Sequence, residues 1–157
     1  MGTYTVTRSV DVACDPATCH ALVDDFHAWT TWSPWEDVDP DLRRTYSGPD
    51  RGVGARYAWS GNRKAGRGSM EIVGSTPEQI DVRLLFEKPW KADNPVKFRF
   101  EPTGAGTRVT WTMTGDNKGV AAVFAKVVNM DKMLGNDFEK GLSRLKAAAE
   151  QDSHGTG

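Results

Sequence analysis

The spacing of apolar residues changes once along the chain, and this change constrains the fold more than any other feature. Over residues 42–114 apolar and polar side chains alternate in short runs separated by turns, whereas over residues 119–150 apolar residues recur at helical spacing. Alternation with short turns predicts an antiparallel sheet that is wet on one face. The later spacing predicts one long amphipathic helix. The expected fold class is therefore α+β, a curved antiparallel sheet with a long C-terminal α-helix.

The N-terminal part predicts one strand and two short helices. Residues 4–12 alternate as a half-buried strand does, and Arg8 lies on the otherwise apolar face. Asp15 followed by Pro16 is typical of a helix N-cap and the first helical position. A second short turn or helix carries tryptophan at every third position, namely Trp29, Trp32 and Trp35.

Length, charge and cysteine content narrow the class of protein. The 157 residues fit a single domain over 1–151, and the polar tail 152–157 is expected to be disordered. Twenty basic against 21 acidic residues leave no basic excess for nucleic acid or an anionic membrane. No stretch approaches the roughly 18 apolar residues of a membrane span. Cys14 and Cys19 are interpreted as reduced thiols, so a soluble cytoplasmic protein is expected.

A curved sheet around a single helix need not close down onto it, so an apolar cavity is expected between the two. Core packing is the alternative role for any one of the candidate lining residues, because buried aromatic residues and methionines are more often core than ligand contacts. The candidate ligand-binding residues are Trp35, Tyr57, Trp59, Met70, Ile72, Leu84, Phe86, Phe98, Phe100, Trp111, Met113, Phe124, Val127, Met130 and Leu134.

Six stretches that span nearly the whole chain carry a resemblance to a known family. They are residues 6–10 (VTRSV), 32–36 (WSPWE), 44–48 (RTYSG), 57–62 (YAWSGN), 107–111 (TRVTW), and 130–133 (MDKM) with 137–142 (DFEKGL). The chain resembles the START-like superfamily and, more closely, the bacterial SRPBCC proteins of the polyketide cyclase/dehydratase-like type. The resemblance implies a helix-grip fold, in which a seven-stranded curved antiparallel sheet wraps around a long C-terminal helix, with two short helices after strand 1. It also implies an apolar cavity but supplies no catalytic motif, because this fold hosts carriers, receptors, cyclases and chaperone co-activators.

Four polar residues are candidates for the cavity: Arg8, His20, Glu71 and Asp131. An inward-facing Arg8 needs a partner, and the sequence offers Asp131, Asp137 and Glu71. Such an ion pair either grips a ligand carboxylate or carbonyl, or only satisfies the buried charge. Relatives usually carry a bulky apolar residue at the position of His20, so the mouth of the pocket is expected to differ here.

The sequence contains no recognisable catalytic or metal-binding motif. His20 and His27 lie on or near the first short helix without a carboxylate, Ser or Cys at a spacing that predicts a dyad. Residues 61–68 are read as a hairpin with a basic tip rather than a phosphate loop. Gly135 and Gly141 interrupt the long helix, either for close packing or as a soft point. We expect no cofactor and no metal.

These observations leave three functional hypotheses. The first is binding or carrying of a small hydrophobic molecule, lipid or polyketide-like, by a monomer or weak homodimer. The second is an enzyme of the polyketide cyclase, aromatase or dehydratase type. The third is a stress-related protein-interaction module that uses the Trp29–Trp35 face or the basic hairpin; it requires the tryptophans to be exposed.

Overall fold

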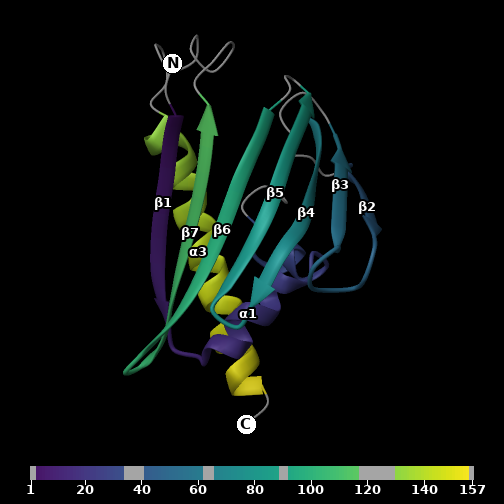
Figure 1. The fold of residues 1–157 in the computed structure, drawn as a ribbon. Helices are drawn as coiled ribbons and strands as arrows, with labels where there is room; N and C mark the ends of the chain where they lie inside the picture. Colours follow the sequence, from purple (N-terminus) through teal and green to yellow (C-terminus); the bar gives the residue numbers. More distant parts are fainter. Residues whose placement is uncertain (1–2, 34–40, 62–65, 89–91, 117–129, 156–157) are drawn as a thin grey trace.

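The computed structural model describes residues 3–33, 41–61, 66–88, 92–116 and 130–155. Seven antiparallel strands form one sheet in the order β1-β7-β6-β5-β4-β3-β2 (Figure 1). The seven-stranded antiparallel sheet and C-terminal helix expected from the sequence are thereby confirmed. The elements are β1 (Thr3–Val12), α1 (Pro16–Asp24), η1 (a 3-10 helix, Ala28–Thr31), β2 (Arg43–Ser47), β3 (Arg56–Ser60), β4 (Arg67–Thr76), β5 (Gln79–Lys88), β6 (Ala92–Thr103), β7 (Gly106–Asp116) and α3 (Met130–Gly155).

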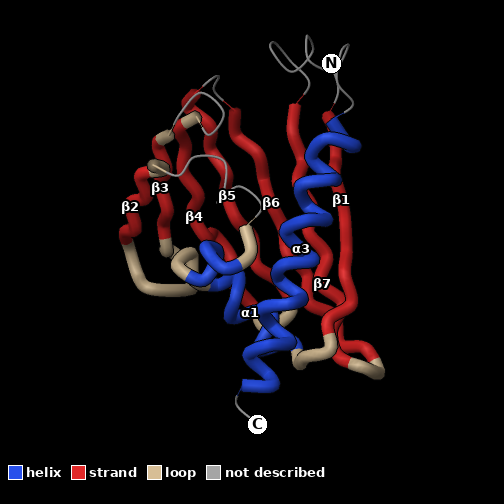
Figure 2. The backbone as a smooth tube through the Cα atoms, turned by 180° about the vertical axis from the view of Figure 1, so that it is seen from behind, coloured by secondary structure: helices blue, strands red, loops and turns tan. Residues whose placement is uncertain are grey.

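The helix α3 runs along the β1–β7 side of the sheet, and its C-terminal end reaches α1 (Figures 1 and 2). Its apolar residues Phe138, Leu142 and Leu145 are all buried against the sheet. Of the expected helical region 119–150, the part before residue 130 lies outside the described residues. The predicted amphipathic packing is confirmed for the part that the structure describes.

The start of α1 follows the expected capping pattern. The Asp15 carboxylate accepts a hydrogen bond from the backbone N–H of Thr18 at 2.9 Å, and Pro16 begins the helix. Hydrogen bonds from the Thr18 side chain and backbone lower the pKa of Asp15. This cap fixes where the chain leaves β1 and turns across the end of the sheet.

Every second side chain along each strand points to the concave face of the sheet. In one cross-strand row Tyr46, Tyr57, Met70, Leu84 and Asn94 lie opposite one another from β2 to β6. Their sequence neighbours point to the other face, which explains the alternation seen in the sequence. The concave face therefore collects most of the large apolar side chains, as expected.

Candidate functional site

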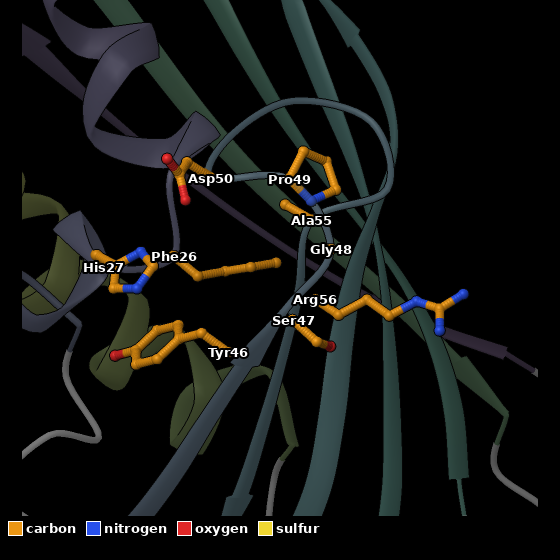
Figure 3. A pocket seen from close by; sticks show the side chains of 9 residues that line it. All are labelled: Phe26, His27, Tyr46, Ser47, Gly48, Pro49, Asp50, Ala55 and Arg56. Atoms are coloured by element: carbon orange, nitrogen blue, oxygen red, sulfur yellow. The ribbon is translucent and has the colours of Figure 1, made fainter.

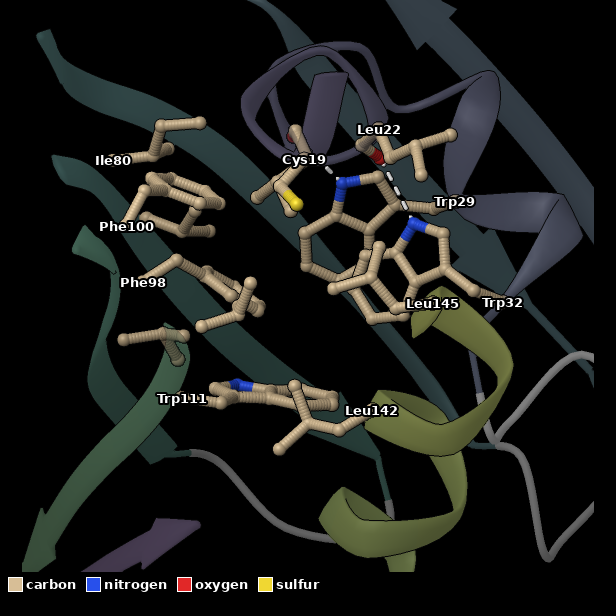
Figure 4. Packing of buried hydrophobic residues seen from close by; sticks show 14 of the residues in the cluster. Cys19, Leu22, Trp29, Trp32, Ile80, Phe98, Phe100, Trp111, Leu142 and Leu145 are labelled. Atoms are coloured by element: carbon tan, nitrogen blue, oxygen red, sulfur yellow. Dashed lines mark hydrogen bonds between the residues drawn. The ribbon is translucent and has the colours of Figure 1, made fainter. Parts of the chain in front are cut away.

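The concave face is tightly sealed at the end that carries the two short helices. Trp29 and Trp32 are 4% and 0% exposed, and their indole N–H groups donate to the carbonyl oxygens of Val23 and Leu22, each at 2.8 Å. Figure 4 shows both indoles packed among residues of the sheet and α3. Because these tryptophans are buried with their N–H groups satisfied, they present no exposed aromatic face to a partner.

Aromatic stacking continues this sealed region toward α3. Trp111 lies flat on Phe138, with ring centroids 4.0 Å apart and an interplanar angle of 4°. Phe98 stacks on Trp111 at 5.0 Å and contacts the rings of Trp29 and Trp32 edge-on. We call Trp29, Trp32, Phe98, Trp111 and Phe138 the closed core. Its members are at most 4% exposed, so they serve as packing rather than as an open surface.

A second aromatic group on the same face is less covered. Trp59 and Phe86 are only partly buried, and Tyr57, Met70 and Leu84 retain 7–9% exposure. We call these five residues the aromatic floor. They lie on β3, β4 and β5, whereas the described helices contact mainly β1, β5, β6 and β7. Among the residues that the structure describes, the floor is therefore the less covered part of the concave face.

A glycine within β4 shapes the aromatic floor. Gly68 pairs with Trp59 on one side and with Phe86 on the other. A Cβ atom at Gly68 would lie only 2.5 Å from the Trp59 ring, so the indole occupies the space that a side chain would fill. The sequence analysis placed Gly68 in the hairpin 61–68, whereas the structure begins β4 at Arg67. A glycine inside a strand signals the close approach of another group.

The other candidate lining residues fall into two groups. Ile72, Phe100 and Met113 are at most 3% exposed and belong to the buried core. For the remaining candidates the structure describes no side chain: Trp35, Phe124, Val127, Met130, Asp131 and Leu134.

Arg8 faces inward as expected, and the structure pairs it with an acid that the sequence did not single out. Its Nε donates to Oε2 of Glu139 on α3 at 3.0 Å, and its guanidinium donates to the Thr7 carbonyl at 2.8 Å. A Cβ atom at Gly135 would lie 2.1 Å from this guanidinium. Gly135 therefore serves close packing, the first of the two roles considered for it.

Glu71 does not join Arg8. It lies on β4 between the concave-face residues Met70 and Ile72, so its side chain points to the convex face. There it pairs with Arg56 at 3.5 Å. The suggestion that Glu71 lines the cavity or partners Arg8 is wrong, because alternation along the strand separates the two faces.

His20 belongs to a short hydrogen-bonded chain where α1 meets the end of β4. Ser75 Oγ donates to Asp24 Oδ1 at 2.8 Å and lies 3.3 Å from His20 Nε2, while the imidazole packs against Phe100. Because Ser75 gives its only proton to Asp24, its oxygen is left to accept one from His20 Nε2. Ser75 stands between the acid and the imidazole, so this is not a Ser-His-Asp triad.

His27 lies beside a separate surface cavity of about 190 Å³ (Figure 3). Its ring stacks on Tyr46 at 3.9 Å, and its Nδ1 lies 2.9 Å from Asp25 Oδ1. Arg56 lines the cavity, but its side chain is directed away from the other lining residues. The Tyr57 ring of the aromatic floor lies next to this cavity, because its centroid is 5.3 Å from that of the lining residue Tyr46.

The two thiols are free and buried. Burial raises the pKa of Cys19 to about 11. Cys14 Sγ donates to the Ala149 carbonyl at 2.9 Å. Both thiols are therefore structural groups, since a reactive cysteine needs a low pKa and exposure.

Two further searches cover only the described parts of the chain. They contain no group of three or more His, Cys, Asp or Glu residues that could hold a metal ion. Within the same ranges, none of the helices combines the length and apolar character that crossing a bilayer requires.

Solved structures with low sequence identity share this fold. The structure of CV1439 from Chromobacterium violaceum is 14% identical, with a TM-score of 0.66, over 93% of this chain and 97% of that one. SA2116 from Staphylococcus aureus, a protein of unknown function, is 8% identical, with a TM-score of 0.70, over 98% and 97% of the two chains. DynU16, encoded in the dynemicin biosynthetic locus, is 14% identical, with a TM-score of 0.63, over 93% of this chain and 47% of that one.

No curated protein matches the sequence. The sequence does match the family described as polyketide cyclase / dehydrase and lipid transport, over residues 3–150. This match agrees with the resemblance drawn from the sequence. The chain therefore belongs to the polyketide cyclase / dehydrase and lipid transport family.

Proposed function

We propose that this protein binds or carries a small hydrophobic molecule on the aromatic floor, between the sheet and the C-terminal helix. The observation that carries the proposal is the unequal coverage of the concave face. Trp59 and Phe86 remain partly exposed, whereas Trp111 and Phe98 on the same face are 2% and 0% exposed. Large apolar side chains left accessible on a concave surface are typical of a ligand site.

The chemistry of the floor also favours apolar binding. Trp59, Phe86 and Tyr57 supply rings, and Met70 and Leu84 supply adaptable aliphatic surface. Family membership supports the same class of function, because it includes lipid transport.

The direct test is native mass spectrometry of freshly purified protein, followed by solvent extraction of any retained molecule. We expect a co-purifying hydrophobic compound, or saturable binding of an apolar fluorescent probe such as 1-anilinonaphthalene-8-sulfonate. Phe86→Ala should weaken probe binding about tenfold or more. Val73→Ala is the matched control, because Val73 is 50% exposed on the opposite face of the sheet. Absence of both retained ligand and probe binding would contradict the proposal, as would equal binding by Phe86→Ala and the wild type.

A second candidate is a cyclase- or dehydratase-type enzyme, and the His20 arrangement is the observation in its favour. An imidazole can abstract an acidic proton beside a carbonyl, and that of His20 is held in place by Ser75 and Phe100. This candidate predicts that His20→Gln abolishes turnover of a poly-carbonyl substrate while leaving its binding intact. Unchanged turnover in His20→Gln would remove the role of His20 as base.

A further inference from the structure

The surface cavity beside His27 brings together two segments that are separate in the sequence (Figure 3). Residues 26–27 come from the segment after α1, and residues 46–50 and 55–56 come from β2, β3 and the turn between them. The volume of about 190 Å³ is smaller than the roughly 300–1,000 Å³ of pockets for drug-sized ligands, so the cavity suits a small molecule. None of the five residues of the aromatic floor lines it, so it is a separate candidate site.

Backbone geometry fixes the wall that the turn between β2 and β3 supplies. Gly48 has a φ of +76°, and a Cβ atom there would lie 2.3 Å from the Gly54 carbonyl oxygen. The Gly52 N–H donates to the Asp24 carbonyl oxygen at 3.0 Å. The Gly54 N–H donates to the Ile72 carbonyl oxygen at 2.9 Å. The turn is thereby tied to both α1 and β4, so little ordering is needed when a ligand binds.

The other wall carries an imidazole whose orientation is also fixed. The His27 ring stacks on Tyr46, with centroids 3.9 Å apart and an interplanar angle of 18°. Oδ1 of Asp25 accepts the backbone N–H of His27 at 2.9 Å and lies equally far from Nδ1. An ionised carboxylate can only accept hydrogen bonds, so Nδ1 carries a proton. With a neutral imidazole, this wall therefore carries the negative charge of Asp25.

The charges around the cavity favour a cation. The Asp50 carboxylate lines the cavity and has no hydrogen bond or ion pair with another residue of the described ranges. Arg56 also lines it, but its side chain is directed away, and its Nε lies 3.5 Å from Oε1 of Glu71. Arg51, which follows Asp50 in the turn, is not a lining residue. A carboxylate beside apolar groups suits a ligand that joins a positive charge to a small apolar body.

We propose that this cavity is a second ligand site, which binds a small organic ammonium compound. The ammonium group pairs with the Asp50 carboxylate, and the carbon skeleton packs against Pro49 and the His27 side chain. A metal ion is a poorer match, because the described residues contain no group of three or more His, Cys, Asp or Glu that could hold one. The site takes a charged ligand at a different place from the aromatic floor, so it goes beyond the proposed function.

The test compares three ligands that share one phenyl ring and differ in charge: benzylamine, benzyl alcohol and benzoate. Each is titrated at neutral pH into the isotope-labelled full chain, and the backbone amide shifts are followed by NMR. Benzylamine should bind saturably, with the largest shifts at residues 26–27 and 46–50. The alcohol and the acid should bind about three- to fivefold more weakly or worse, the discrimination that one exposed ion pair provides.

Two variants test the role of the carboxylate. Asp50→Asn keeps the shape of an exposed turn residue and removes its charge, so the variant should fold as the wild type does. It should weaken benzylamine binding about three- to fivefold and leave benzyl alcohol binding unchanged. Asp11→Asn is the matched control, because it removes the same charge from β1, at the opposite edge of the sheet. It should bind benzylamine as the wild type does.

Phe86→Ala separates this site from the aromatic floor, because it should weaken binding of the apolar probe and leave benzylamine binding intact. Amide shifts centred on the aromatic floor and lost in Phe86→Ala would place the amine there and overturn the ammonium site. Equal binding of benzylamine and benzyl alcohol would also overturn it, as would unchanged benzylamine binding by Asp50→Asn. Absence of saturable benzylamine binding would overturn this site alone, since the apolar probe tests the proposed function independently.

Discussion

The closed core and the aromatic floor use the same kinds of residue on the same face of one sheet, yet they differ in what lies over them. In the closed core Trp111 is covered by Phe138 of α3, and Trp29 and Trp32 are tied to the chain at α1. In the aromatic floor Trp59 packs over Gly68 and stays partly exposed. Among the described elements, those that cross a part of this face decide whether an aromatic residue there is buried or stays partly exposed.

The largest expected effect on stability comes from the closed core. Trp111→Ala removes a buried ring stacked between Phe98 and Phe138, so we expect a loss of about 3–5 kcal/mol in the free energy of unfolding. Urea denaturation followed by circular dichroism measures this loss. A cost below about 1 kcal/mol would show that the closed core is not packed as described, and the comparison would fail.

The buried thiol of Cys19 predicts that the free energy of unfolding depends on pH. Because burial raises its pKa from 9.0 to about 11, the unfolded chain loses this proton at lower pH than the folded protein. Stability from this thiol is therefore complete below about pH 9 and is lost as the pH rises toward 11. We expect a loss on the order of 2 kcal/mol over that window. Cys19→Ala should show a shallower decline in the same denaturation series; an identical slope would argue against a buried neutral thiol.

A smaller effect is expected where α3 crosses Arg8. Gly135→Ala should cost about 1–2 kcal/mol, because the added methyl group collides with the Arg8 guanidinium. In an Arg8→Ala background the same change should instead stabilise by up to about 1 kcal/mol, since alanine is the better helix former. A double-mutant cycle from denaturation curves gives the coupling. Additive effects would mean that Gly135 does not accommodate Arg8.

A smaller loss of stability than in the closed core is expected on the aromatic floor. Trp59→Ala removes a ring that is partly exposed, so it should cost less unfolding free energy than Trp111→Ala while strongly weakening binding of an apolar probe. Trp111→Ala should show the opposite balance. If both variants lose similar amounts of stability and of binding, the two regions are not functionally distinct.

Much of this architecture could be predicted from the sequence because the relevant forces are local. Alternation fixes which side chains share a face of a strand, and Asp15 with Pro16 marks the start of α1. The inward direction of Arg8 and the outward direction of Glu71 both follow from strand periodicity. Applying that rule to Glu71, between Met70 and Ile72, would have excluded it from the cavity at the outset.

The partners of these residues could not be predicted in the same way, because they come from distant parts of the chain. Glu139 is 131 residues from Arg8, and Ser75 is 55 residues from His20. Local sequence patterns do not indicate which of these distant residues come into contact.

The strand and helix pattern, the apolar face and the family can be read from the order of residues, since short-range periodicity and motif residues carry that information. Which aromatic residues seal the core and which stay partly exposed depends on packing between distant parts of the chain. That division depends on strand order and on where the helices cross the sheet. It depends equally on the missing side chain of Gly68, which lets the Trp59 indole lie across β4.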